Sequence, residues 1–182
     1  MRAALVVFTS ITLGLAAGCV LKLFGLGPSL EEAAGVLGRA LGVEFKMQLA
    51  PEQVHRFERW VSRGGLPRLE AIGPAKGPAW LSLGVRLAPG ADRRLGELLE
   101  LTLPQWDDRR AWLRSALHKL EGSRRERASI RLEPKTNRVV VLEVDRQVSL
   151  ARLTVMTLVW DDYARGLEAK QRKEAAARSR DQ

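Results

Sequence analysis

The chain has few of the residues that build catalytic or metal centres. It holds one cysteine and two histidines in 182 residues. The cysteine, Cys19, precedes the predicted domain, which excludes disulfides and cysteine-ligated zinc there. His55 and His118 lack a second histidine at ligand spacing, and no glycine-rich loop has phosphate-binding form. We therefore predict no catalytic residue, no metal, no cofactor and no enzymatic activity.

Two Trp-Asp-Asp triplets are the strongest remaining sign of acid–base or cation chemistry. Asp107 and Asp108 follow one tryptophan, and Asp161 and Asp162 follow another. Neighbouring residues of a helix point about 100° apart, so one pair alone does not converge on an ion. A pair near a helix start instead complements the helix dipole. An enzyme would need both triplets in one pocket, and this remains the least favoured hypothesis.

Long uncharged runs are confined to the N-terminus. No residue from Ala3 to Leu21 is charged, and after Lys22 the apolar run continues to Phe24. At 1.5 Å per residue this run nearly spans a hydrocarbon core of about 30 Å. We predict that Ala3 to about Phe24 targets the protein to a membrane, within an N-terminal region of residues 1–28.

The fate of this segment has three alternatives. The favoured one is a retained single-pass anchor in a bacterial inner membrane, with the domain in the periplasm because the short N-terminal tail is cationic. The second is a lipoprotein signal, since residues 15–19 resemble a bacterial lipobox ending in Cys19, although Ala16 replaces the usual leucine. The third is a signal peptide cleaved near Ala17.

The remainder has an ordinary globular composition. The chain is 46% hydrophobic and 28% charged, with a net charge of +9, and the charges are interspersed rather than gathered in one block. We predict one α+β domain over residues 29–168 and a basic polar tail over residues 169–182.

Hydrophobic periodicity and turn residues predict the elements of this domain. Ser29 and Glu32 form a capping box for a helix that Gly42 ends. Alternation predicts strands and 3.6-residue periodicity predicts helices. The expected helices are 30–41, 52–63, one capped by Asp92 that runs to about residue 101, one from Pro104 to Gly122, and one from Ser149 onward, where Val155, Thr157 and Val159 would also suit a strand. The expected strands are 43–49, 66–72, 81–87, 128–132 and 140–144.

This order of elements predicts the fold class. Strands without strict alternation with helices favour a mainly antiparallel sheet with helices on one face. Residues 81–144 run strand, helix, helix, strand, strand, which resembles the element order of a POTRA-type unit, a module of envelope assembly machinery. The resemblance implies a role in protein assembly.

An interface is predicted on the helix after Pro104. Trp112 falls outside the apolar stripe of that helix, and tryptophan is enriched at interfaces. Arg109, Arg110 and Arg114 lie beside it in the densest basic part of the chain. We expect these four residues to contact a partner, whereas nothing specific indicates nucleic acid.

Together these observations favour a non-enzymatic, membrane-tethered envelope protein whose α+β domain makes protein–protein contacts in an assembly. The alternative is a membrane-anchored basic domain that binds an anionic polymer or lipid head groups.

Overall fold

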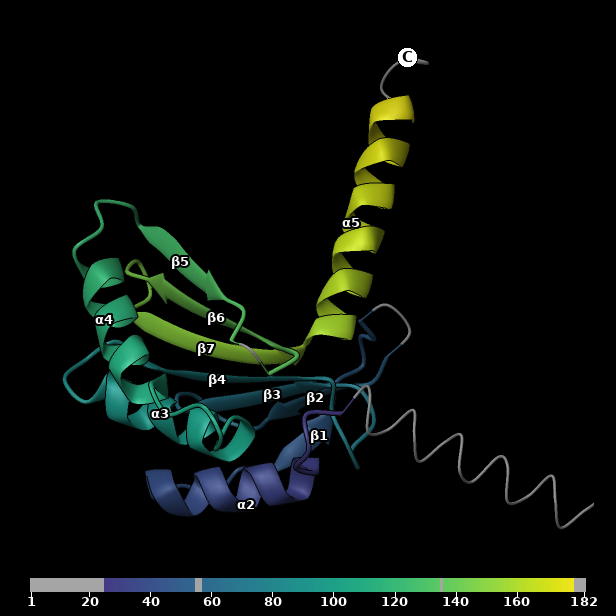
Figure 1. Cartoon of the computed structure of the whole chain (residues 1–182). Coiled ribbons are helices and arrows are strands. Elements are labelled where there is room, and N and C mark those ends of the chain that lie inside the picture. Colours follow the sequence, from purple (N-terminus) through teal and green to yellow (C-terminus); the bar gives the residue numbers. More distant parts are fainter. Residues whose placement is uncertain (1–24, 55–56, 135, 179–182) are drawn as a thin grey trace, which may run out of the picture.

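The computed structural model describes residues 25–54, 57–134 and 136–178. These residues form an α+β domain with a seven-stranded antiparallel sheet and four helices, which confirms the predicted α+β class and antiparallel sheet. Helices α2 (Leu30–Leu41), α3 (Ala91–Thr102) and α4 (Arg109–Glu121) pack on one face of the sheet, whereas α5 (Leu158–Arg178) stands away from the body (Figure 1).

The sheet has the strand order β1-β2-β3-β4-β7-β6-β5, and every neighbouring pair is antiparallel. Strand β7 therefore lies between β4 and β6, and it separates the parts of the strand-helix-helix-strand-strand unit predicted over residues 81–144. The strands are β1 (Met47–Leu49), β2 (Arg59–Ser62), β3 (Arg68–Ile72), β4 (Trp80–Arg86), β5 (Arg127–Leu132), β6 (Arg138–Asp145) and β7 (Leu150–Thr157).

Side-chain alternation gives the sheet two different faces. Leu81, Leu83 and Val85 of β4 point toward the helices and are buried, as are Leu142 of β6 and Leu153 of β7. They form one hydrophobic core with the inward stripes of α2, α3 and α4. The intervening residues point the other way, and we call their side of the sheet the outer face.

Helix α2 begins and ends as predicted. The Ser29 hydroxyl accepts from the Glu32 backbone N–H at 3.2 Å, and the Glu32 carboxylate accepts from the Ser29 N–H at 2.8 Å. This backbone hydrogen bond lowers the pKa of Glu32. Gly42 ends the helix in the left-handed conformation, with φ of 67°, which glycine adopts without steric cost.

The helix predicted over residues 52–63 is wrong. Val54 and Phe57 form an isolated bridge, and residues 59–62 form β2 between β1 and β3. Trp60 lies opposite Ala71 and packs on the core, whereas Val61 points to the outer face. Pairing with two neighbouring strands has outweighed the short apolar stripe that favoured a helix.

The helix predicted from Ser149 onward is wrong in its first half. Residues 150–157 form β7, and α5 begins at Leu158. Strand β7 pairs with β4 and β6 along its full length and is largely buried on both faces, which obscures its alternation.

Two smaller predictions also need correction. The strand predicted over residues 43–49 is limited to β1. Helix α3 has Gly90 in the N-cap position and no side-chain cap, so Asp92 lies in its first turn instead of capping it.

The predicted membrane segment, Ala3 to Phe24, lies outside the described residues, so the structure lends it no support. Within residues 25–54, 57–134 and 136–178, no helix combines the length and apolarity that crossing a bilayer requires. The first described residues are attached to the body: the Leu26 N–H donates to the Pro78 carbonyl at 2.9 Å, and Arg138 donates to the Gly25 carbonyl at 3.2 Å.

The base of α5 is fixed to the outer face. Trp160 is buried and makes an edge-on contact with Phe57, with ring centroids 5.0 Å apart. Asp161, also buried, accepts from both terminal nitrogens of Arg131 on β5, at 2.5 and 2.7 Å. These hydrogen bonds lower the pKa of Asp161. Beyond this base, α5 has mostly exposed side chains.

Candidate docking surface

One end of the outer face is covered by the base of α5. Ile72, Ala79 and Trp160 form a small buried cluster there, against which Trp80 and Met156 pack. This cluster covers the apolar residues at that end of β3, β4 and β7, while Phe57 and Tyr163 beside it remain 36% and 43% exposed.

The other end of the outer face is uncovered. A row of residues in register crosses five strands there, because each residue pairs with the next across the sheet. Small and charged residues make up this row. In strand order the row is Arg68, Gly84, Arg152, Glu143 and Ser129.

A hollow of about 220 Å³ opens on this row between β3, β4 and β7. Its apolar wall is made by Leu66 and Val148, which are 42% and 63% exposed, together with Leu150. Gly84 lies beneath them. A Cβ atom at Gly84 would come within 3.3 Å of the nearest Leu150 methyl group. Glycine at this position therefore allows the two leucines to pack closely on the strand.

A second hollow of about 820 Å³ adjoins the first and extends past β5 and the α4–β5 connection to the last turns of α4, so that Lys119 and Leu120 on the helical side also line it. Both are lined by Val148, Leu150 and Arg152. We call the two joined hollows the open-face groove, which extends from Leu66 through Arg152 to Arg125. The groove runs across the strands. A partner strand added at the edge of the sheet would instead lie along β5.

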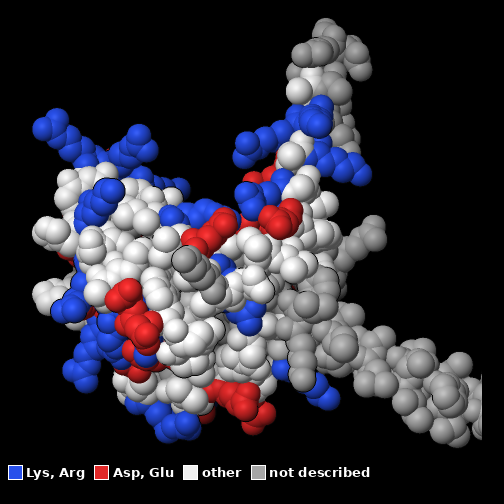
Figure 2. Space-filling model, in the orientation of Figure 1, with Lys and Arg blue, Asp and Glu red and all other residues white. Residues whose placement is uncertain are grey.

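The open-face groove contains cations without carboxylate partners. Arg68 pairs with Glu70 at 2.9 Å, and Arg127 pairs with Asp145 at 2.6 Å. By contrast, three lining cations make no ion pair with any described residue, and they are Lys119, Arg125 and Arg152. Lys and Arg side chains gather over the α4–β5 connection and along α5 (Figure 2).

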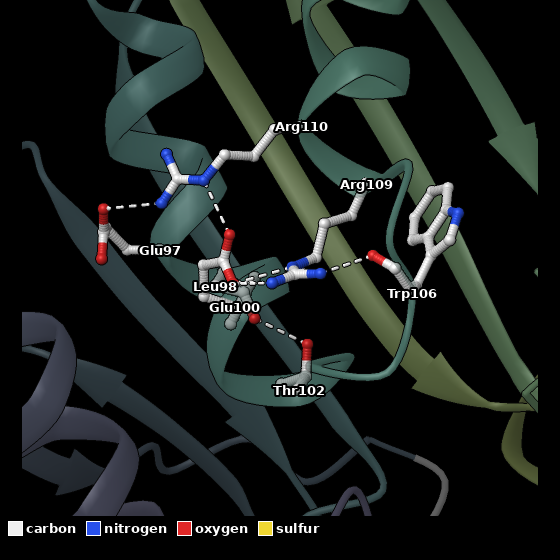
Figure 3. Close-up of polar contacts among 7 residues, drawn as sticks. All are labelled: Glu97, Leu98, Glu100, Thr102, Trp106, Arg109 and Arg110. Atoms are coloured by element: carbon white, nitrogen blue, oxygen red, sulfur yellow. Dashed lines mark hydrogen bonds and ion pairs between the residues drawn. The ribbon is translucent and has the colours of Figure 1, made fainter.

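Arg109, one of the predicted interface residues, has an internal role. It projects from the start of α4 toward α3, where its Nε donates to Glu100 at 2.8 Å (Figure 3). Its Nη1 donates to the Trp106 carbonyl at 2.6 Å. The hydrogen bond from Arg109 is the main cause of the lowered pKa of Glu100. Arg109 therefore connects α3 to the α3–α4 turn.

Arg110 and Trp112 are also engaged within the domain. Arg110 donates to Glu100 at 2.7 Å and to Glu97 at 3.4 Å, and the Glu100 contact is the main cause of its raised pKa. Trp112 is half-buried, with its ring 5.4 Å from that of Trp106. Arg114 is exposed and has no ion pair among the described residues. An interface at these residues stays a prediction.

The two Trp-Asp-Asp triplets do not meet. Asp107 and Asp108 lie at the start of α4, on the helical side of the sheet, whereas Asp161 contacts an outer-face arginine. In the described part of the chain, no three His, Cys, Asp or Glu side chains are grouped to hold a metal ion. Cys19 and His55 lie outside the described residues, and His118 is exposed near the end of α4.

Sequence reasoning missed the open-face groove because it assigned residues 150–157 to a helix. The β-branched residues Val155 and Thr157 also suit a strand, but burial on both faces hides the alternation that would have identified it. No protein-family model, curated protein or solved structure matches the chain. The resemblance to a POTRA-type unit is accordingly one of element order alone.

Proposed function

We propose that this protein is a non-enzymatic, membrane-tethered envelope protein that contacts a partner protein through the open-face groove. The observation that carries the proposal is the uncovered end of the outer face, where exposed Leu66 and Val148 flank the unpaired Arg152. A recessed apolar wall next to an arginine has the composition that protein interfaces favour.

The tether rests on the sequence, through the apolar run from Ala3 to Phe24. The location proposed for the domain is the periplasmic side of a bacterial inner membrane, with lipidation of Cys19 as the alternative to a retained span. Mass determination of the mature N-terminus separates the two. A topology reporter fused after Gln182 tests the compartment, and reporter activity on the cytoplasmic side would refute a periplasmic domain.

Site-specific cross-linking tests the contact. A photoreactive amino acid at position 148 is placed in the open-face groove of the full chain, and the control places it at position 36, where Val36 is exposed on α2. We expect position 148, and not position 36, to yield adducts with the same identified protein in repeated preparations of native membranes. Recovery of only uncross-linked protein from both positions would refute the proposal.

A second candidate function is binding to an anionic polymer or lipid surface. It is favoured by the exposed α4–β5 connection, where Lys119, Arg124 and Arg125 make no ion pairs with described residues. Such binding weakens steeply as salt rises because it is mainly electrostatic. Failure of the full chain to bind anionic vesicles or cell-wall fragments at low ionic strength would exclude this function.

A further inference from the structure

We infer that the occupant of the open-face groove is an extended, acidic segment of a partner protein, with a carboxylate on Arg152 and an apolar side chain in the adjacent hollow. The inference rests on the proposed function and specifies the chemistry of the partner. Each part of it follows from a different feature of the groove.

The carboxylate follows from Arg152. Its side chain is partly buried, yet it has no hydrogen bond or ion pair with any described residue. It lies in register between Gly84 on β4 and Glu143 on β6, near the middle of the groove. A guanidinium presents donors that match a carboxylate in pairs. Because Arg152 is already partly desolvated, a partner carboxylate gains the contact at a smaller desolvation cost.

The apolar side chain follows from the hollow beside Arg152. Leu66 and Leu150 close over Gly84, and a Cβ atom there would lie 3.6 Å and 3.3 Å from their methyl groups. Val148 completes the wall and is mostly exposed. A volume of about 220 Å³ suits one or two side chains. Filling it would remove three exposed or half-exposed apolar side chains from water.

The extended shape follows from the direction of the groove. The registered row crosses five strands, and neighbouring strands lie about 4.8 Å apart, so the row is about 19 Å long. An extended chain advances about 3.3 Å per residue, so about six residues cover this length. Alternate side chains of such a segment would face the groove, which suits an acidic residue two positions from an apolar one.

The acidic character follows from the balance of unpaired charge. Arg152, Lys119 and Arg125 lack carboxylate partners among the described residues, and Glu143 is the exposed carboxylate opposed to them. A second copy of this chain fits poorly because each copy carries a net charge of +9 and like-charged surfaces repel. Single-stranded nucleic acid fits poorly as well, because the lining contains no aromatic side chain on which bases could stack. The apolar hollow is recessed, whereas a membrane surface needs a projecting face.

Peptide binding to the full chain in zwitterionic nanodiscs tests the inference. The probe is a fluorescein-labelled peptide of eight alternating Asp and Leu residues, followed by fluorescence anisotropy. Matched peptides replace Asp with Lys, or Leu with Ser. We expect the Asp/Leu peptide to bind at least about tenfold more tightly than either, which corresponds to about 1.4 kcal/mol.

Two arginine variants locate the site. Arg152→Glu is expected to weaken binding of the Asp/Leu peptide about tenfold or more, whereas Arg114→Glu, the same charge change on the helical side, leaves it within about twofold. Val148→Ser should also weaken it, through the apolar wall. Circular dichroism of each variant establishes that the fold is kept.

The outcomes separate this inference from the proposed function. No selective binding of the Asp/Leu peptide, or equal losses in Arg152→Glu and Arg114→Glu, overturns the inference. Binding of phosphatidylglycerol vesicles or an oligonucleotide in its place, with the same sensitivity to Arg152→Glu, also overturns it. In these cases cross-linking from position 148 to a protein still supports the proposed function, whereas its absence removes both.

Discussion

Replacing Asp161 with asparagine should loosen the base of α5. The carboxylate is 6% exposed and accepts two hydrogen bonds from Arg131, while Arg165 contributes an ion pair at 2.8 Å from the following turn. The amide keeps the shape of the side chain but loses the charge and places an NH₂ group against a guanidinium donor. At least one strong hydrogen bond is therefore lost, and Arg131 keeps only the amide oxygen at position 161 and Glu133 as acceptors.

The loss of stability expected for Asp161→Asn depends on how deeply Asp161 and Arg131 are buried. A hydrogen bond to a charged group contributes about 1.5–3 kcal/mol when both partners are buried. Arg131 is 36% exposed, so water compensates it in part, and we expect Asp161→Asn to lower the free energy of unfolding by about 1–2 kcal/mol.

The adjacent carboxylate supplies a matched control. Asp162 is 63% exposed and pairs with Arg165 three residues on, so Asp162→Asn should cost about 0.5 kcal/mol or less. Both changes remove one negative charge from the first turns of α5 and alter the helix dipole interaction similarly. Urea unfolding of the full chain gives the difference, and hydrogen exchange of residues 158–165 locates it. Equal losses in the two variants would refute the assigned role of Arg131.

Acidification provides an independent check of the same contact. Hydrogen bonds from Arg131 lower the pKa of Asp161 from an ordinary value of about 3.9. A carboxylate with a lowered pKa contributes stability above its unfolded pKa, and this contribution disappears as the pH falls through its folded pKa. The gap in stability between wild type and Asp161→Asn should therefore be full at neutral pH and shrink below about pH 4.

Three further substitutions test how α2 is built. Gly38→Ala should destabilise the domain by about 1–3 kcal/mol, because its Cβ atom would lie 2.7 Å from the Val43 carbonyl oxygen. Gly35→Ala, on the same helix, meets only Arg39 at 3.6 Å and should stabilise it by up to about 1 kcal/mol. Ser29→Ala removes one half of the capping box and should cost about 0.5–2 kcal/mol. Urea unfolding measures all three, and similar values for the two glycine variants would contradict the close approach at Gly38.

Local chemistry made α2 and the β5–β6 hairpin predictable. A hydroxyl at Ser29, a carboxylate three residues later and a glycine at position 42 satisfy the helix ends without help from distant residues. In the hairpin, β5 lies at a sheet edge and keeps a strict alternation of more and less exposed residues. That alternation is visible in the sequence because one side of the strand stays in water.

Strands β2 and β7 were not predictable on the same grounds. Trp60 and Val61 both favour burial, and only pairing with β1 and β3 sends them to opposite faces. In β7, Leu153 is buried on the core side while Thr154 is buried on the outer side, so the segment lacks a polar face. The open-face groove could not be predicted either, since its lining comes from several strands and from the connections before β3, β5 and β7, which meet only after the sheet forms.

The attachment of the first described residues determines how far this domain could reach. Gly25 and Leu26 are bonded to Arg138 and Pro78, at the start of β6 and just before β4. The open-face groove crosses β4 six residues farther along, at Gly84, which is about 20 Å away for a strand. If the anchor ends at Phe24, as proposed, no linker separates it from the domain, and the domain would move little relative to the bilayer. The domain would then meet partners by lateral diffusion in the bilayer. The groove would reach only partners whose binding segment lies at the same distance from the membrane surface.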